Sequence, residues 1–70
     1  MSVKLLDVVA LLEDEAKHGL LRGQVGTVVE AVAPSVFEVE FSDNDGRTYA
    51  TVAVPAEKLL VLRHEVIEAA

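Results

Sequence analysis

The sequence contains no cysteine and no tryptophan, and its aromatic residues are two phenylalanines and one tyrosine. A chain without cysteine forms no disulfide bond and offers no thiolate ligand to zinc. This absence fits a reducing compartment, and we expect a cytoplasmic protein. The shortage of aromatic residues argues against the aromatic-lined groove with which many small β domains bind proline-rich peptides.

Basic residues are also few, since six lysines and arginines face twelve acidic residues and the net charge is −6. Proteins that bind nucleic acid draw most of their affinity from neutralising phosphates, so this charge disfavours a nucleic-acid partner. The same charge keeps a small apolar-rich chain in solution and complements a basic protein.

Long hydrophobic runs are missing as well. The first apolar stretch is interrupted at Asp7, too early for a signal peptide or a membrane span, and we expect no membrane association. Seventy residues make one domain, and a chain of this size buries only about 60% of its unfolded surface. Domains this small are often stabilised by a partner or by self-association, and we expect one of the two here.

The first apolar stretch (residues 3–12) has the length and composition of either a strand or a buried helix. The adjacent Val8 and Val9 and the lack of a helix-ending glycine favour a strand. Its alternation places Val8, Ala10 and Leu12 on one face and Asp7, Val9 and Leu11 on the other. Both faces are apolar, so the pattern leaves open which of them belongs to the core.

A long connection follows over residues 13–24, acidic at its start and containing glycines towards its end. Loops of this length in a compact domain are usually anchored by packed side chains or carry a function. We expect Leu20 and Leu21 to be the anchors.

Gly23 and Gly26 lie three residues apart just before a run of β-branched residues, which indicates a tight loop that leads into a strand over residues 24–32. A phosphate-binding glycine loop needs a helix N-terminus behind it, and here a strand follows. We therefore interpret both glycines as structural. Pro34 is expected to turn the chain after this strand.

Residues 36–41 show the clearest alternation, with Phe37, Val39 and Phe41 predicted to face the core and the intervening glutamates to face solvent. Residues 42–46 form a turn cluster that ends in glycine, so we expect a hairpin. The returning strand covers residues 47–54. Its expected inward side chains are Thr48, Ala50, Val52 and Val54. The opposite face, with Tyr49, Thr51 and Ala53, alternates almost as well and stays open as the alternative.

A proline at position 55 favours a single helical turn over residues 55–59, followed by a short strand over residues 60–63. The tail, residues 64–70, is expected to be frayed or a short helical turn. We expect either this tail or a partner to cover the second apolar face of the first strand.

These elements predict an all-β fold, a small five-stranded barrel with a long first loop and a short helical turn before the last strand, closed so that no strand edge is exposed. The residues that carry a family resemblance are Asp7-Val8-Val9-Ala10-Leu11, His18-Gly19-Leu20, Arg22-Gly23-Gln24-Val25-Gly26-Thr27-Val28-Val29-Glu30, Val39-Glu40-Phe41, Asp45-Gly46-Arg47-Thr48-Tyr49 and Pro55-Ala56-Glu57-Lys58-Leu59.

The order of these segments resembles the SH3-like barrels, and the whole chain resembles a family of small bacterial proteins catalogued as domain of unknown function 4926. The resemblance implies an SH3-like barrel over residues 1–63 followed by the tail, and it implies no activity. The central glycine segment is less specific. Similar openings occur in KOW segments of ribosomal proteins and in the barrel of nitrile hydratase β subunits.

No group of residues matches a catalytic or metal-binding pattern. His18 and His64 both lie among acidic residues, but isolated histidines outside a ligand motif are usually surface residues. The serines, Ser2, Ser35 and Ser42, lie at the terminus or in turns and lack a nucleophile motif. We expect no enzyme activity, no metal and no cofactor.

The sequence therefore predicts a non-catalytic protein-interaction module, with a regulatory or antitoxin-like role towards a protein encoded beside it. The alternatives are a KOW-like RNA or ribosome-associated module and an accessory barrel of an enzyme complex. We expect another protein, a basic one, or a second copy as the partner. The candidate contact residues lie in the acidic loop and among apolar residues near the chain ends: Glu13, Asp14, Glu15, Leu11, Val66 and Ile67.

Overall fold

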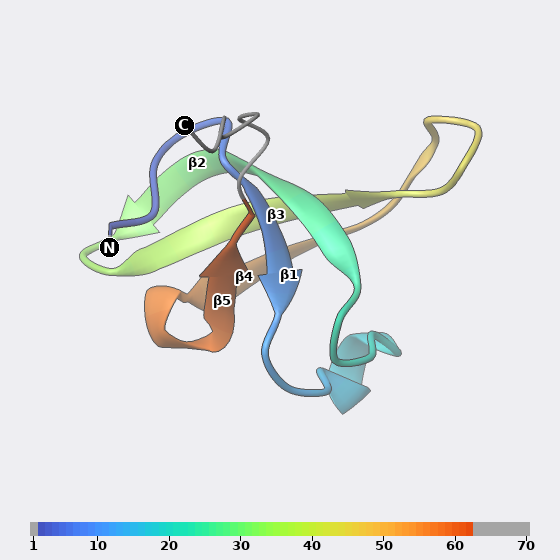
Figure 1. The fold of residues 1–70 in the computed structure, drawn as a ribbon, viewed down its shortest axis with the longest axis horizontal. Helices are drawn as coiled ribbons and strands as arrows, with labels where there is room; N and C mark the ends of the chain where they lie inside the picture. The colour runs from blue at the N-terminus through green and yellow to red at the C-terminus, as the bar shows by residue number, and fades with distance from the viewer. Residues whose placement is uncertain (1, 63–70) are drawn as a thin grey trace, which may run out of the picture.

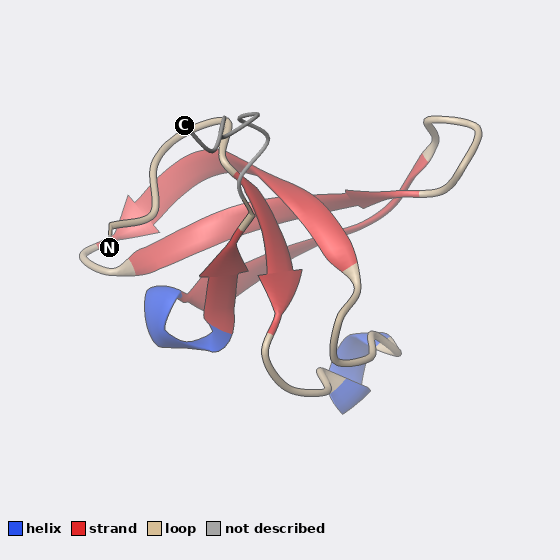
Figure 2. Cartoon of the chain, viewed as in Figure 1, coloured by secondary structure: helices blue, strands red, loops and turns tan. Residues whose placement is uncertain are grey.

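A computed structural model describes residues 2–62, and nearly all of its regular structure is one antiparallel sheet (Figure 1). The spatial order of the strands is β4-β3-β2-β1-β5. Two short 3-10 helices complete the described elements (Figure 2). The prediction of an all-β, five-stranded fold is confirmed. The strands are β1 (Val8–Leu11), β2 (Val25–Ala33), β3 (Val36–Ser42), β4 (Thr48–Pro55) and β5 (Leu59–Val61), and the 3-10 helices are η1 (Ala16–His18) and η2 (Ala56–Lys58).

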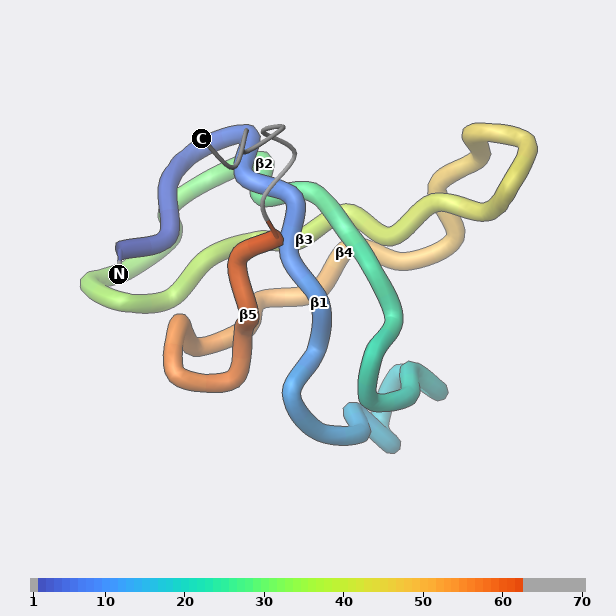
Figure 3. The backbone as a smooth tube through the Cα atoms, viewed as in Figure 1, coloured from blue at the N-terminus to red at the C-terminus, as the bar shows by residue number. Residues whose placement is uncertain are grey.

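The sheet bends through β2, its longest strand. The first residues of β2 pair with β1, and the strand pairs with β3 along most of its length. Its pairing with β3 is irregular between Val28 and Glu30 and again between Ala31 and Ala33, and such bulges sharpen the bend and twist of a sheet. As a result β1 and β5 cross over the β3–β4 hairpin (Figure 3), and the core lies between the two halves.

The two ends of this sheet are not joined to each other. Strands β4 and β5 are its edges, and no pairing between them is found in the part of the chain that the structure describes. The chain passes from one edge to the other through η2. The predicted absence of strand edges is therefore wrong, because among the described strands β5 pairs only with β1 and β4 pairs only with β3.

The core draws on every strand and on one loop residue. The largest fully buried side chains are those of Phe41, Leu20, Val9, Val28 and Val39. Burying a side chain of this size contributes roughly 1.5–3 kcal/mol. The inward face predicted for the β3 strand is confirmed, with Phe37 partly buried at its margin. Among residues 2–62, the buried cluster comprises Val9, Leu11, Leu20, Val28, Val39, Phe41, Val52, Val54 and Leu59.

The inward set predicted for the β4 strand is confirmed for Val52 and Val54 but is wrong for Thr48, which is exposed. The register with β3 shifts between the pairs Phe41↔Ala50 and Ser42↔Thr48. One extra residue, Tyr49, therefore stands in β4, and the alternation beyond it changes phase.

The two glycines of the central segment, Gly23 and Gly26, have different structural roles. Gly23 has φ +91°, a conformation that glycine adopts readily, and its N–H donates to the Leu11 carbonyl at 2.8 Å. Gly26 is buried in β2, where a β-carbon would stand only 2.7 Å from Val39 Cγ1 and 2.9 Å from the Glu40 carbonyl oxygen. The structural interpretation of both glycines is confirmed: one allows a turn and the other a close approach of two strands.

Candidate functional site

The acidic first loop is one of the two candidates for a partner contact, and its carboxylates form contacts within the chain. The Glu15 carboxylate accepts hydrogen bonds from the His18 backbone N–H at 3.0 Å and pairs with His18 Nδ1 at 2.6 Å. The hydrogen bond from the His18 side chain is the main reason why the pKa of Glu15 lies below its ordinary value. Glu15 and Leu20 also exchange backbone hydrogen bonds of 2.8 and 3.0 Å. Glu15 therefore closes the loop around η1.

The two acidic residues before Glu15 also form contacts within the chain, Asp14 with the end of the loop and Glu13 with η2. Asp14 Oδ1 accepts a hydrogen bond from the Arg22 backbone N–H at 2.8 Å. Glu13 Oε1 lies 3.0 Å from Lys58 Nζ, and this hydrogen bond is the main cause of the raised pKa of Lys58. Exposed ion pairs of this kind contribute little stability, so the Glu13 carboxylate leaves its contact more easily than those of Asp14 and Glu15.

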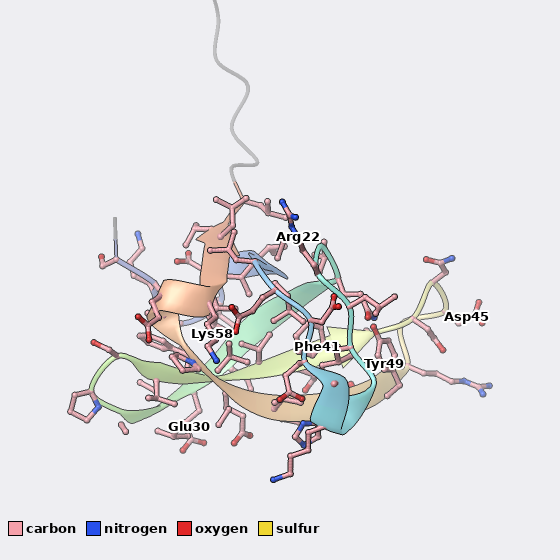
Figure 4. All side chains as sticks on the ribbon, turned by 90° about the horizontal axis from the view of Figure 1, so that it is seen from below. Arg22, Glu30, Phe41, Asp45, Tyr49 and Lys58 are labelled. Atoms are coloured by element: carbon pink, nitrogen blue, oxygen red, sulfur yellow. The ribbon has the colours of Figure 1, made fainter. Side chains whose placement is uncertain are left out.

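One of the two predicted loop anchors is confirmed. Leu20 is 2% exposed and belongs to the core, whereas Leu21 is 62% exposed. The loop is further tied to the β3–β4 hairpin, since Gln24 Nε2 donates to the Tyr49 hydroxyl at 2.8 Å. Figure 4 shows Arg22 on the loop and Tyr49 on the hairpin. The loop is thus fastened by packing and by polar contacts.

The apolar candidates for a partner contact are Leu11, Val66 and Ile67, and the structure describes only the first of them. Leu11 is 3% exposed and packs inside the core, so its side chain is not available to a partner, contrary to the prediction. The reason is register: Leu11 lies opposite Leu59 of β5 on the inward face of β1. Val66 and Ile67 lie outside the described residues.

The other face of β1 forms an apolar surface that points away from the core. Ala10 stands directly opposite Val25 of β2 on one side and Leu60 of β5 on the other. Paired residues in an antiparallel sheet share a face, and Val25 and Leu60 are 48% and 47% exposed. The Leu62 N–H donates to the Val8 carbonyl at 2.8 Å, which extends the same ladder. We call these residues the outer apolar patch: Val8, Ala10, Val25, Leu60 and Leu62. Val25 and Leu60 are its exposed members, Val8 and Leu62 are half-buried, and Ala10 is only 9% exposed.

A group of glutamates continues this face across β2 and β3. Glu30 stands opposite Glu38, and Glu40 stands opposite Thr27. We call Glu30, Glu38 and Glu40 the outer acidic patch. Within residues 2–62 no lysine or arginine forms an ion pair with any of the three. Glu30 extends away from the side on which Phe41 is packed (Figure 4).

Sequence reasoning missed this combined surface, although part of its signal was present. The alternation of the first strand showed that both faces are apolar. It did not show that Val25 and Leu60 would lie beside Ala10, because that neighbourhood joins residues far apart in the chain.

Two further features bear on ligand binding, a surface hollow and the arrangement of the titratable side chains. A shallow open hollow near the β2–β3 turn is lined by Pro34, Ser35, Val36, Pro55, Ala56 and Glu57. Over the described range 2–62, no three histidine, aspartate or glutamate side chains gather as they would around a metal ion. No helix among the described elements has the length and apolar character needed to cross a membrane.

Fold and surface together define a small all-β domain of one bent antiparallel sheet, with an apolar and acidic outer face. The family model described as "Domain of unknown function (DUF4926)" matches residues 5–61, so the chain belongs to that family. Comparison with curated proteins and with solved structures gave no match.

Proposed function

We propose that this chain is a non-catalytic protein-interaction module built on an SH3-like barrel. The strand order, the long first loop and the helical turn before the last strand support the SH3-like assignment. The single observation that carries the function is the outer apolar patch, in which Val25 and Leu60 are about half exposed. A domain of this size has few apolar side chains with which to form a core, so leaving two of them half exposed is costly unless a partner covers them. Exposed apolar side chains that lie close together on one face are typical of a binding site.

The charge supports a basic protein as the partner. The chain carries a net charge of −6, and the outer acidic patch lies on the same face as the apolar residues. A small acidic module without a catalytic cluster suits a regulatory or antitoxin-like role towards a protein encoded beside it, in the cytoplasm. The same acidic face opposes phosphate binding and therefore argues against the KOW-like RNA role.

Co-purification tests the proposal. The full chain, tagged and expressed at its natural level in its own cells, should elute with one stoichiometric protein, and light scattering should give the mass of a complex. Elution as a monomer without a stoichiometric protein would contradict the proposal. Recovery of RNA that is lost steeply as salt is added would favour the RNA-binding alternative instead.

A further inference from the structure

We infer that the outer apolar patch and the outer acidic patch act as one site that binds a basic amphipathic helix of a partner protein. This inference rests on the proposed function and specifies its surface and its partner chemistry.

The shape of the apolar patch fits a single helix. Its central row runs Val25–Ala10–Leu60 across β2, β1 and β5, and a second row adds Val8 and Leu62. Neighbouring strands lie about 4.8 Å apart, so three strands span roughly 10 Å, which is about the diameter of one α-helix. Ala10 is only 9% exposed and lies between Val25 and Leu60, which are about half exposed, so an apolar stripe of a helix would contact these two larger side chains. Helices recognise partners in this way through apolar residues spaced three and four apart.

The position of the glutamates specifies the charge of that helix. In the second row Val8 pairs with Thr27, and Thr27 pairs with Glu40, so the acidic patch begins one strand beyond the apolar patch. Glu30 and Glu38 oppose each other directly, an arrangement that is unfavourable for the isolated sheet. A lysine or arginine of the partner placed between them removes this repulsion. The occupant therefore carries basic residues along one side of its apolar stripe.

A second copy of this chain fits the site less well. Each copy has a net charge of −6, so self-association would bring two acidic chains together. Lys58, the last residue of η2 before β5, already pairs with Glu13. A basic segment from a different protein supplies the charge that the face requires.

The probe for a direct test is a synthetic leucine–lysine peptide of about four helical turns, with leucines on one stripe. A scrambled peptide of the same composition, which has no stripe, and a leucine–glutamate peptide serve as controls. Each is titrated into the isotope-labelled full chain while backbone amide shifts are recorded. We expect the striped basic peptide to shift amides at Val8, Thr27, Glu40 and Leu60 and to bind at least about tenfold more tightly than either control.

Matched variants locate the site. Leu60→Gln and Glu40→Lys should each weaken binding of the striped peptide by about tenfold or more, because the first removes an exposed apolar side chain and the second reverses a charge. Leu21→Gln and Asp45→Lys make the same chemical changes at exposed positions outside both patches and should alter affinity less than about twofold. If circular dichroism shows that Leu60→Gln is unfolded, Val25→Thr takes its place.

The inference is overturned by three results. The first is no binding of the striped peptide, and the second is equal binding of the scrambled peptide. The third is that the peptide shifts only amides outside the two patches, which is also the result expected if residues 63–70 of the chain itself occupy the face. Failure here is separable from failure of the proposed function. A natural partner that binds the wild type, Leu60→Gln and Glu40→Lys equally well leaves the interaction role intact and removes this surface from it.

Discussion

Gly26 in β2 packs directly against Val39 in β3: a β-carbon on Gly26 would lie 2.7 Å from Val39 Cγ1. That separation is too short for two carbon atoms in contact. The Glu40 carbonyl oxygen at 2.9 Å closes the second side of the same space. The strand that joins both halves of the sheet therefore depends on a residue without a side chain.

Gly26→Ala should destabilise the protein. Overpacking a filled core costs about 1–3 kcal/mol, and in a domain of this size each kcal/mol lowers Tm by about 4–8 °C. Thermal unfolding measures the loss. The double variant Gly26→Ala with Val39→Ala should lose less than the sum of the single variants, because the second change removes the Cγ1 that the new methyl group meets. Full additivity would show that the contact is not the cause.

Leu20→Ala should release the first loop from the core. Leu20 is 2% exposed, and replacing a buried leucine by alanine costs about 2–5 kcal/mol. Leu21→Ala is the matched control, because Leu21 is 62% exposed and its replacement should change stability by less than about 0.5 kcal/mol. Urea unfolding compares the two. Equal losses would contradict the assignment of Leu20 as the anchor.

Glu30→Lys should stabilise the isolated protein. It replaces two like charges in directly paired positions, Glu30 and Glu38, by opposite charges, a change worth about 0.2–1 kcal/mol. Glu30→Gln should give a smaller gain, and added salt should reduce both gains. Urea unfolding at low and high salt measures the effect. A loss of stability in both variants would show that the two carboxylates do not repel each other.

The Glu15–His18 contact should make the free energy of unfolding depend on pH in the acidic range. The pKa of Glu15 is lowered in the folded protein, chiefly by the His18 hydrogen bond, so its contribution is present above the unfolded value of about 4.3 and is lost as pH falls through the folded value. Glu15→Gln should therefore lose stability near neutral pH and show a flatter decline below pH of about 4.

Urea unfolding at several pH values from neutral to about 3 tests this expectation. Glu57→Gln, at an exposed position in η2, is the matched control and should retain the decline of the wild type. Parallel pH curves for the wild type and Glu15→Gln would contradict the role assigned to Glu15.

Much of the fold was predictable because its signals are local. The alternation around Val39 marks its strand and its inward face, and Gly46, with φ +80°, closes the predicted hairpin turn. Pro55 precedes the predicted helical turn. In each case one residue or one short pattern restricts the backbone by itself.

The candidate site was less predictable because it depends on contacts between distant residues. The acidic side chains of Asp14 and Glu15 gave the first loop the pattern of an exposed charged surface. In the folded chain they hold backbone N–H groups of Arg22 and His18 instead. A charged residue in a sequence indicates a side chain that will form polar contacts. Whether those contacts lie within the chain or with another protein depends on how the loop folds.

The sequence by itself determined where the chain extends and where it turns, because alternation, glycine and proline act on their own neighbourhoods. Only the tertiary structure decided which apolar face of β1 became the core and that Tyr49 shifts the phase of β4. Both decisions follow from strand register. A period of two residues distinguishes the two faces of a strand, but only the neighbouring strands determine which face is covered.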